Sequence, residues 1–167
     1  MLASAKQWFI NRYVEHMIAS VNSNAERVRQ LQSESGMARE RVSRFEFFDG
    51  DVTLRARVPQ KSYPLTLRIH RDGTVERLPN DTRPDVTVFT DIPTVYGIAR
   101  GEYTMVLPSG ARKPYPSFTV WDAVRLGKIE WTGASSALAE LMLFEKRIGP
   151  EFLEAMRLPE LEPSSGR

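Results

Sequence analysis

The sequence predicts an α+β domain in which a long N-terminal helix precedes a five-stranded, mostly antiparallel sheet. Three observations predict this class: a helical apolar stripe in the first 32 residues, alternation of apolar and charged residues in the middle of the chain, and capped short helices in the second half. The chain has 167 residues, of which 41% are hydrophobic, and it has no cysteine. It is therefore long enough to bury a core without disulfide bonds or a structural metal.

Residues 3–32 are predicted to form one long helix. Its apolar side chains recur in steps of four and three, with a gap at Asn24 and Ala25. The stripe consists of Ile10, Val14, Met17, Val21, Val28 and Leu31. It could dock on the chain's own domain, which is the simpler interpretation, or pair with another subunit. Gly36 is expected to end the helix.

From Arg44 the apolar period becomes two, which is typical of strands with one buried face. Strands are predicted at residues 52–58, on both sides of the Asp72-Gly73 turn within 65–78, and at 85–90. Because apolar and charged residues alternate, one face of the sheet should be buried and the other exposed to water.

The second half of the chain carries start and stop signals for short helices. Asp91 is a predicted N-cap, Pro93 suits the first turn, and Gly101 should end this helix. The next segment, residues 103–118, contains three prolines and a Ser-Gly pair, so it is either a long loop or a strained hairpin. Segments of this length often serve as lids or contact surfaces.

A second short helix is predicted to begin at Thr119, which with Asp122 has the spacing of a capping box, and to end at Gly127. The remaining predicted elements are a fifth strand at 128–132, an amphipathic helix at 136–148, a last short helix opening at Pro150, and a solvated tail at 158–167.

The charge balance does not indicate a nucleic-acid-binding protein. The net charge is only +2, with a pI near 9.0, and the basic residues are mixed with acidic ones. No segment approaches the roughly 20 apolar residues that span a bilayer. We therefore expect a soluble, cytoplasmic domain, in which Trp8, Phe9 and Arg12 could make at most a transient membrane contact.

The sequence contains no recognisable catalytic or metal-binding pattern. His16 and His70 lie in different elements, and Ser-His-Asp sets, HExxH spacing and calcium loops are absent. Both histidines are predicted to lie on the solvated surface. We therefore expect neither a cofactor nor a metal and find no positive support for an enzyme, although patterns do not reveal a cofactor-free reaction inside a pocket.

One stretch of the second half carries a recognisable pattern. The strand PDVTVFTD leads into a short helix ending in ARGE, and the pattern A-x-x-x-G-K-[IL]-x-[IVW]-x-G follows before the amphipathic helix. The pattern residues are Ala123, Gly127, Lys128, Ile129, Trp131 and Gly133. In these features the chain resembles the sterol carrier protein type 2 domain family. We therefore divide it into an N-terminal helix for docking or oligomerisation (1–35), a sterol-carrier-like domain (44–148) and a short helix with a tail (149–167).

The resemblance implies helices on one face of the sheet and an apolar tunnel between sheet and helices. That tunnel would bind or transfer a lipid, such as an acyl chain, a sterol or an isoprenoid, without catalysis. Two features depart from the family. The proline-rich segment 103–118 replaces a brief link between the short helices, and the N-terminal helix is longer than usual.

The predicted ligand site centres on Ile129 and Trp131, which share one face of the fifth strand. Its full set is Phe89, Tyr96, Ile98, Trp121, Val124, Ile129, Trp131, Leu138, Leu141 and Met142. Each of these residues could instead simply fill the core. Two other functions stay open: an accessory module that binds a protein partner or a second copy of the chain through the N-terminal helix and segment 103–118, and a cofactor-free enzyme acting on an apolar substrate.

Overall fold

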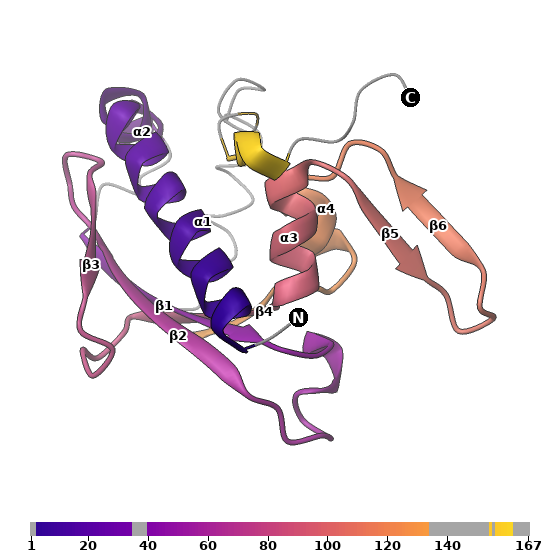
Figure 1. Ribbon diagram of the computed structural model, residues 1–167. Coiled ribbons are helices and arrows are strands. Elements are labelled where there is room, and N and C mark those ends of the chain that lie inside the picture. Colours follow the sequence, from indigo (N-terminus) through magenta and orange to yellow (C-terminus); the bar gives the residue numbers. More distant parts are fainter. Residues whose placement is uncertain (1–2, 35–39, 134–153, 155, 162–167) are drawn as a thin grey trace.

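The computed structural model describes residues 3–34, 40–133, 154 and 156–161. Within these ranges, helices cover one face of a five-stranded sheet, and a two-stranded hairpin projects to the side (Figure 1). This arrangement confirms the predicted α+β class and its N-terminal helix. Among the described residues, no helix is both long enough and apolar enough to cross a bilayer.

The five-stranded sheet has the order β3-β2-β1-β4-β7. Its strands are β1 (Arg41–Phe48), β2 (Ser62–Ile69), β3 (Val75–Leu78), β4 (Val86–Asp91) and β7 (Glu130–Gly133). Three neighbouring pairs are antiparallel, but β1 and β4 run parallel. The sheet is therefore mostly antiparallel, as predicted, and contains one parallel pair because the chain passes from β3 across to the free edge of the central strand β1.

The strand register decides which side chains face the helices. Phe45, Leu65, Val88 and Trp131 are cross-strand neighbours and share one face. Leu65, only 1% exposed, belongs to the main hydrophobic core together with residues of the N-terminal helix, so this is the helix-covered face. Successive residues of a strand point to opposite faces. The residues directly before and after each of these four on its own strand therefore point to the outer face.

The N-terminal segment forms two helices, α1 (Ala3–Ser23) and α2 (Ala25–Glu34), rather than the predicted single helix. The break lies at Asn24, where the predicted stripe has its gap. The backbone N–H of Asn24 binds the Val21 carbonyl, three residues back, and its side chain donates to the Ser20 carbonyl at 2.8 Å. These local hydrogen bonds compete with the regular helical pattern.

The apolar stripe of α1 packs on the chain's own domain. Ile10 and Val14 are 3% and 1% exposed, and Met17 and Val21 pack against the same core. This outcome matches the simpler of the two interpretations of the stripe. The described part of α1 leaves little of the stripe for a second subunit. The side chains of Val28 and Leu31 lie outside the described residues.

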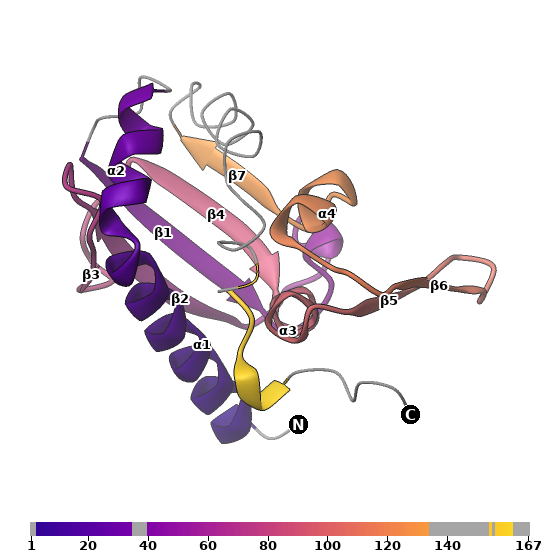
Figure 2. The same cartoon turned by 90° about the horizontal axis from the view of Figure 1, so that it is seen from above.

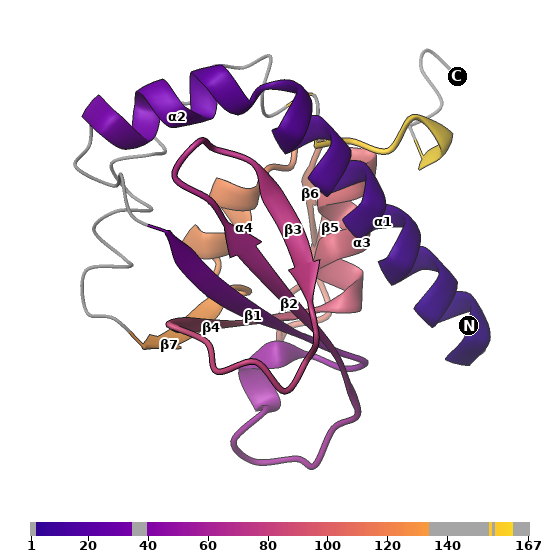
Figure 3. The ribbon, with the colours of Figure 1, turned by 90° about the vertical axis from the view of Figure 1, so that its left-hand side faces the viewer.

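One asparagine ties α1 to the edge strand β3, where the helix passes the β2–β3 side of the sheet (Figure 3). The Asn22 side chain donates to the Val75 carbonyl at 3.1 Å and accepts from the Val75 N–H at 2.7 Å. An exposed sheet edge has unpaired backbone groups. Asn22 satisfies one such pair and holds α1 at a defined height over the sheet.

The prediction of a strand at residues 52–58 was wrong. These residues begin with the 3₁₀ helix η1 (Val52–Leu54), in which the Asp51 side chain accepts a hydrogen bond from the Thr53 N–H. Val52 is fully buried, whereas Leu54 and Val58 are 41% and 48% exposed, so the alternation does not correspond to a buried strand face. The sequence analysis did not predict β1, the strand that completes the sheet. It begins at Arg41, three residues before the alternation of apolar and charged residues starts at Arg44.

The elements of the second half follow the predicted signals closely. Helix α3 (Ile92–Arg100) is N-capped by Asp91 and ends at Gly101. Segment 103–118 is a hairpin rather than a loop, with strands β5 (Tyr103–Val106) and β6 (Arg112–Tyr115). Both views show it extending away from the sheet beyond α3 (Figures 1 and 2). Helix α4 (Val120–Arg125) starts with the predicted capping box of Thr119 and Asp122.

The solvated tail predicted from residue 158 begins as a packed segment. Leu158 is 2% exposed, and its N–H donates to the carbonyl of Ala99 in α3 at 2.8 Å. The short 3₁₀ helix η2 (Pro159–Leu161) follows. The start of the predicted tail is therefore packed rather than solvated, because the apolar Leu158 side chain is buried next to α3. The predicted helix at 136–148 and the start of the last helix lie outside the described residues.

Two glycines of the Ala123–Gly133 pattern should respond differently to a methyl group. Gly127 has φ of 71° and open space where a Cβ would lie, whereas Gly133 has φ of 127° and its Cβ would lie 2.5 Å from the Asp85 carbonyl oxygen. We expect Gly127→Ala to cost about 1 kcal/mol, since only backbone strain is added. Gly133→Ala should cost about 3 kcal/mol or more, because strain and a backbone clash combine. Urea unfolding of both variants measures the difference, and equal costs would contradict this account.

Candidate functional site

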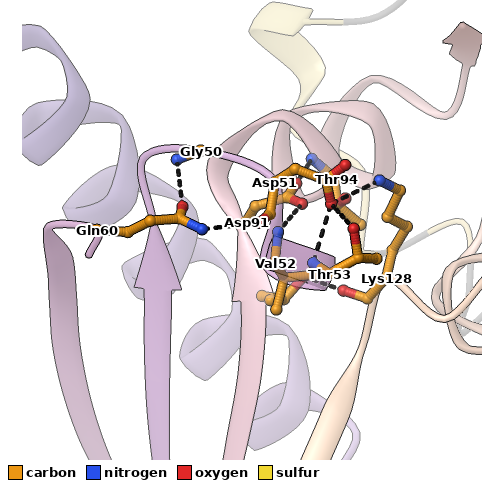
Figure 4. Close-up of polar contacts among 9 residues, drawn as sticks. Gly50, Asp51, Val52, Thr53, Gln60, Asp91, Thr94 and Lys128 are labelled. Carbon is orange, nitrogen blue, oxygen red and sulfur yellow. Dashed lines mark hydrogen bonds and ion pairs between the residues drawn. The ribbon is translucent and has the colours of Figure 1, made fainter. Parts of the chain in front are cut away.

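A polar cluster lies where β4 runs into α3, and it is centred on a buried carboxylate (Figure 4). Asp91 is only 2% exposed. One of its carboxylate oxygens accepts from the Thr94 N–H at 2.8 Å, and the other accepts from the Val52 N–H at 3.0 Å. Because both oxygens bind backbone donors, Asp91 joins η1 to the start of α3 and has a positioning role rather than that of a free acid or base.

An ion pair extends this cluster to the loop before β7. The ammonium of Lys128 lies 2.9 Å from Oδ1 of Asp51, and the Lys128 side chain is only 13% exposed. The same Asp51 oxygen accepts from the N–H and hydroxyl of Thr53. The hydroxyl of Thr90, on β4, donates to the Lys128 carbonyl at 2.9 Å, so the backbone of this loop is also held to the sheet.

These contacts shift the pKa values of the ion pair in opposite directions. Burial alone would raise the pKa of Asp51, but hydrogen bonds from Lys128 and Thr53 outweigh it and hold the pKa below the usual 3.8. Burial alone would lower the pKa of Lys128, but the bond to Asp51 and its charge raise the pKa above 10.5. Both groups are therefore charged over the whole neutral range.

A groove of about 630 Å³ lies next to this cluster, between α3 and the hairpin. Its lining is mostly apolar and comes from α3, from both strands of the hairpin and from the start of α1. The lining residues are Lys6, Asp49, Ile92, Pro93, Tyr96, Gly97, Arg100, Glu102, Tyr103, Thr104, Pro114, Tyr115 and Pro116. Aromatic rings and prolines thus form the walls of the groove.

Packed rings hold the walls of the groove in place. Tyr96 lies against Phe9 of α1, with ring centroids 5.5 Å apart. On the hairpin side, Tyr103 and Tyr115 pack on Phe118 at 4.7 Å and 5.9 Å, and Phe118 is 1% exposed. Burial raises the pKa of the Tyr103 hydroxyl, which stays neutral. The groove is therefore built on anchored side chains.

The polar residues of the groove form ion pairs along its lining. The ammonium of Lys6 lies 3.0 Å from Oδ1 of Asp49, and Arg100 pairs with Glu102. All four side chains are at least one-quarter exposed. A bound ligand could therefore exchange contacts with either cation without first bringing a buried charge to the surface.

Four residues of the predicted ligand site lie on α4, on β7 or just before β7. Trp131 lies on the helix-covered face beside Val88, and Ile129, just before β7, packs against the core. Trp121 is 6% exposed at the start of α4, and Val124 is half-buried one turn further on. This group is separate from the lining of the groove.

The other predicted residues are dispersed. Tyr96 lines the groove, and Ile98 is buried in the main core. Phe89 lies on the outer face of the sheet, because its cross-strand neighbour is Glu130 rather than Trp131. There it stacks on Phe48, with the Arg55 guanidinium 4.0 Å above its ring. Leu138, Leu141 and Met142 lie outside the described residues.

Sequence reasoning missed most of the groove, including Tyr103, Tyr115 and the two prolines at 114 and 116. A signal was available, since the proline-rich segment 103–118 has the length and composition of a lid or contact surface. The hairpin pairing of Tyr103 with Tyr115 places their side chains together. That pairing depends on strand register, which the composition of the segment does not reveal.

Comparison with known proteins gives a match at the level of structure alone. No protein-family model and no curated protein sequence matches the chain. A crystal structure of sterol carrier protein 2 superposes with a TM-score of 0.51 and 13% identity, covering 87% of this chain and 94% of that one. The chain has the fold of sterol carrier protein 2. This confirms the predicted resemblance for the arrangement of helices and strands.

A second similar structure is that of the palmitated sterol-carrier-like protein SCP2L2 from Aedes aegypti. It has a TM-score of 0.46 and 18% identity, over 81% of this chain and 95% of that one. A third is the apo form of sterol carrier protein 2 from Yarrowia lipolytica, with a TM-score of 0.39 and 9% identity, over 86% and 88% of the two chains.

Removing the Asp91 carboxylate should destabilise this sterol-carrier-like fold strongly. In Asp91→Ala the buried N–H groups of Val52 and Thr94 lose their acceptors, and we expect a loss of about 3 kcal/mol. Thr119→Ala, which removes the half-buried N-cap of α4, is the matched control and should cost about 1 kcal/mol. Urea unfolding measures both. A cost for Asp91→Ala no larger than that of the control would show that the buried carboxylate does not hold η1 and α3 together.

The Asp51–Lys128 pair should make stability depend on pH in a defined direction. The pKa of Asp51 is lower in the folded state than its unfolded value of 3.8, so its contribution is present above pH 3.8 and is lost as the pH falls through the folded pKa. Lys128, raised above 10.5, contributes below that pH and loses its effect as the pH rises through its folded value. Asp51→Asn should therefore lower Tm at neutral pH and converge with the parent chain in acid. A difference in Tm that stays constant down to the lowest accessible pH would contradict the assignment.

Proposed function

We propose that the chain binds a lipid or another apolar ligand non-covalently and can transfer it. The observation that carries this proposal is the groove of about 630 Å³ between α3 and the hairpin, on a fold like that of sterol carrier protein 2. Its volume lies within the range of small-molecule sites, roughly 300–1,000 Å³, and such sites combine apolar walls with a few polar groups. Both features are present here.

The lining of the groove supports a ligand with an apolar chain and an anionic end. Tyr96, Tyr115 and the neighbouring prolines present wide apolar surfaces to a chain. Arg100 and Lys6 are the cations that could meet a carboxylate or phosphate, by exchanging it for part of their contact with Glu102 and Asp49. A fatty acid or another single-chain anionic lipid has this combination of groups.

The predicted residues of α4 and β7 are a second proposed place for the apolar chain. They are Trp121 and Val124 of α4, Ile129 just before β7, and Trp131 of β7. The indole N–H of Trp121 is buried and has no hydrogen-bond partner among the described residues, although buried indole donors usually have one. A polar atom of a bound ligand could accept from it, as expected of a site between sheet and helices.

Photo-crosslinking shows which of the two proposed places binds the apolar chain of the ligand. A fatty acid carrying a diazirine is added to the purified protein, and the mixture is irradiated. The labelled peptides are then mapped by mass spectrometry. Labels at Tyr96, Tyr103 or Tyr115 would place the acyl chain in the groove, and labels at Trp121 or Trp131 would place it at the residues of α4 and β7. Organic extraction of the freshly purified protein tests for a ligand that co-purifies.

A pair of tryptophan substitutions sharpens this test. Thr104→Trp introduces a large ring on an exposed residue that lines the groove, whereas Ala56→Trp introduces the same ring on an exposed turn outside it. If the groove holds the ligand, Thr104→Trp should weaken binding of the fatty acid by roughly tenfold, since the ring occupies space that the acyl chain would fill. Ala56→Trp should bind like the parent chain. Saturable binding of no apolar probe, with no co-purifying lipid, would overturn the proposed function.

A further inference from the structure

The free end of the β5–β6 hairpin combines exposed apolar and basic side chains. Val106 is 65% exposed, although it is a strand residue, and it pairs across the hairpin with exposed Arg112. Met105 pairs with Lys113, which is also exposed. The turn beyond them is closed by two backbone hydrogen bonds of 2.8 Å. Apolar side chains of β5 therefore lie opposite basic side chains of β6 on a defined scaffold, which we call the hairpin tip (residues 105–113).

The charged residues of the β5–β6 hairpin are all basic. From residue 103 to residue 121 the sequence contains Arg112 and Lys113 but no aspartate or glutamate. The β2–β3 hairpin differs, because its exposed Arg71 and Arg77 stand beside Asp72 and Glu76. The hairpin tip therefore keeps an uncompensated local charge of +2, even though the charges of the whole chain nearly balance.

The hairpin is held at its base and extends away from the rest of the molecule (Figures 1 and 2). The buried ring of Phe118 packs against both Tyr103 and Tyr115, and the Phe118 N–H donates to the Gly101 carbonyl at 2.8 Å. A tip carried on such a base is already ordered, so little conformational entropy is lost when it meets a surface.

We propose that the hairpin tip docks on an anionic lipid bilayer surface. Basic side chains near anionic headgroups favour binding, and an adjacent apolar side chain can enter the boundary between headgroups and acyl chains. The exposed Val106, paired with Arg112 across the hairpin, supplies that apolar contact. A lipid surface accounts for both properties of the tip, whereas attraction to a hydrophilic polyanion would use only the charge.

The structure favours the hairpin over the N-terminal helix as the membrane contact. Of the three α1 residues considered for such a contact, Phe9 is 3% exposed and Arg12 is paired with Glu160. Only Trp8, 65% exposed, projects freely from the helix. The base of the hairpin also supplies Tyr103 and Tyr115 to the groove. Docking at the tip would thus connect a lipid surface with a wall of the groove, but vesicle binding needs no ligand and is testable independently of the proposed function.

Vesicle co-sedimentation tests the charge contribution. The full chain is mixed with phosphatidylcholine vesicles, or with vesicles that also contain phosphatidylserine, at low and high salt. We expect binding to the anionic vesicles alone and a decrease with salt. Combining Arg112→Gln with Lys113→Gln should reduce the partition coefficient roughly 10- to 30-fold, since two basic residues leave the surface. Combining Arg71→Gln with Arg77→Gln removes the same charge from the other hairpin and should change binding much less.

Site-specific labelling tests which residue enters the lipid. The chain has no cysteine, so each single cysteine variant takes one environment-sensitive fluorophore. The label on Val106→Cys should brighten on anionic vesicles, whereas the label on Val58→Cys, an exposed apolar residue of another loop, should not. Unchanged thermal unfolding of each variant shows that it is folded.

Four results would overturn the proposal: no binding to anionic vesicles, equal loss of binding in both double variants, brightening of a label on Trp8→Cys but not on Val106→Cys, or binding to heparin with no vesicle binding. The last result would show that the tip recognises polyanions through charge alone.

Discussion

The carboxylate of Asp91 holds η1 against the junction where β4 continues directly into α3. It ends β4, caps α3 and accepts a hydrogen bond from the first residue of η1, all from a position that is 2% exposed. Because β1 and β4 run parallel, the loop after β1 and the helix after β4 emerge at the same end of the sheet. A buried acceptor at this point aligns them, and the groove and the hairpin take their positions from α3.

Helix α3 is the element from which both proposals follow. It buries Val95 and Ile98 in the core and presents Tyr96 to the groove, where the ring also contacts Phe9 of α1. The hairpin that continues from α3 forms the facing wall and then extends beyond it. One wall of the groove and the exposed cationic tip therefore belong to one continuous segment of the chain.

Local signals predicted the elements that depend on a few neighbouring residues. The caps at Asp91 and Thr119, the Asp72-Gly73 turn and the end of α3 at Gly101 are all confirmed, because a side chain binding a backbone group two or three residues away is encoded in adjacent sequence. The prediction of a strand at 52–58 was wrong because here, too, a local side-chain contact decided the backbone structure. Its alternation was present, but the local cap by Asp51 closed a 3₁₀ turn instead.

The sequence by itself determined the α+β class, most helix ends, the β2–β3 hairpin and the resemblance to the sterol carrier fold. Tertiary structure alone decided that β1 and β4 are parallel, that Phe89 faces away from Trp131, and that Tyr103 and Tyr115 lie side by side on one wall of the groove. The physical reason is strand register. A shift of one residue moves every side chain of a strand to the other face, and register is set by pairing between segments far apart in the chain.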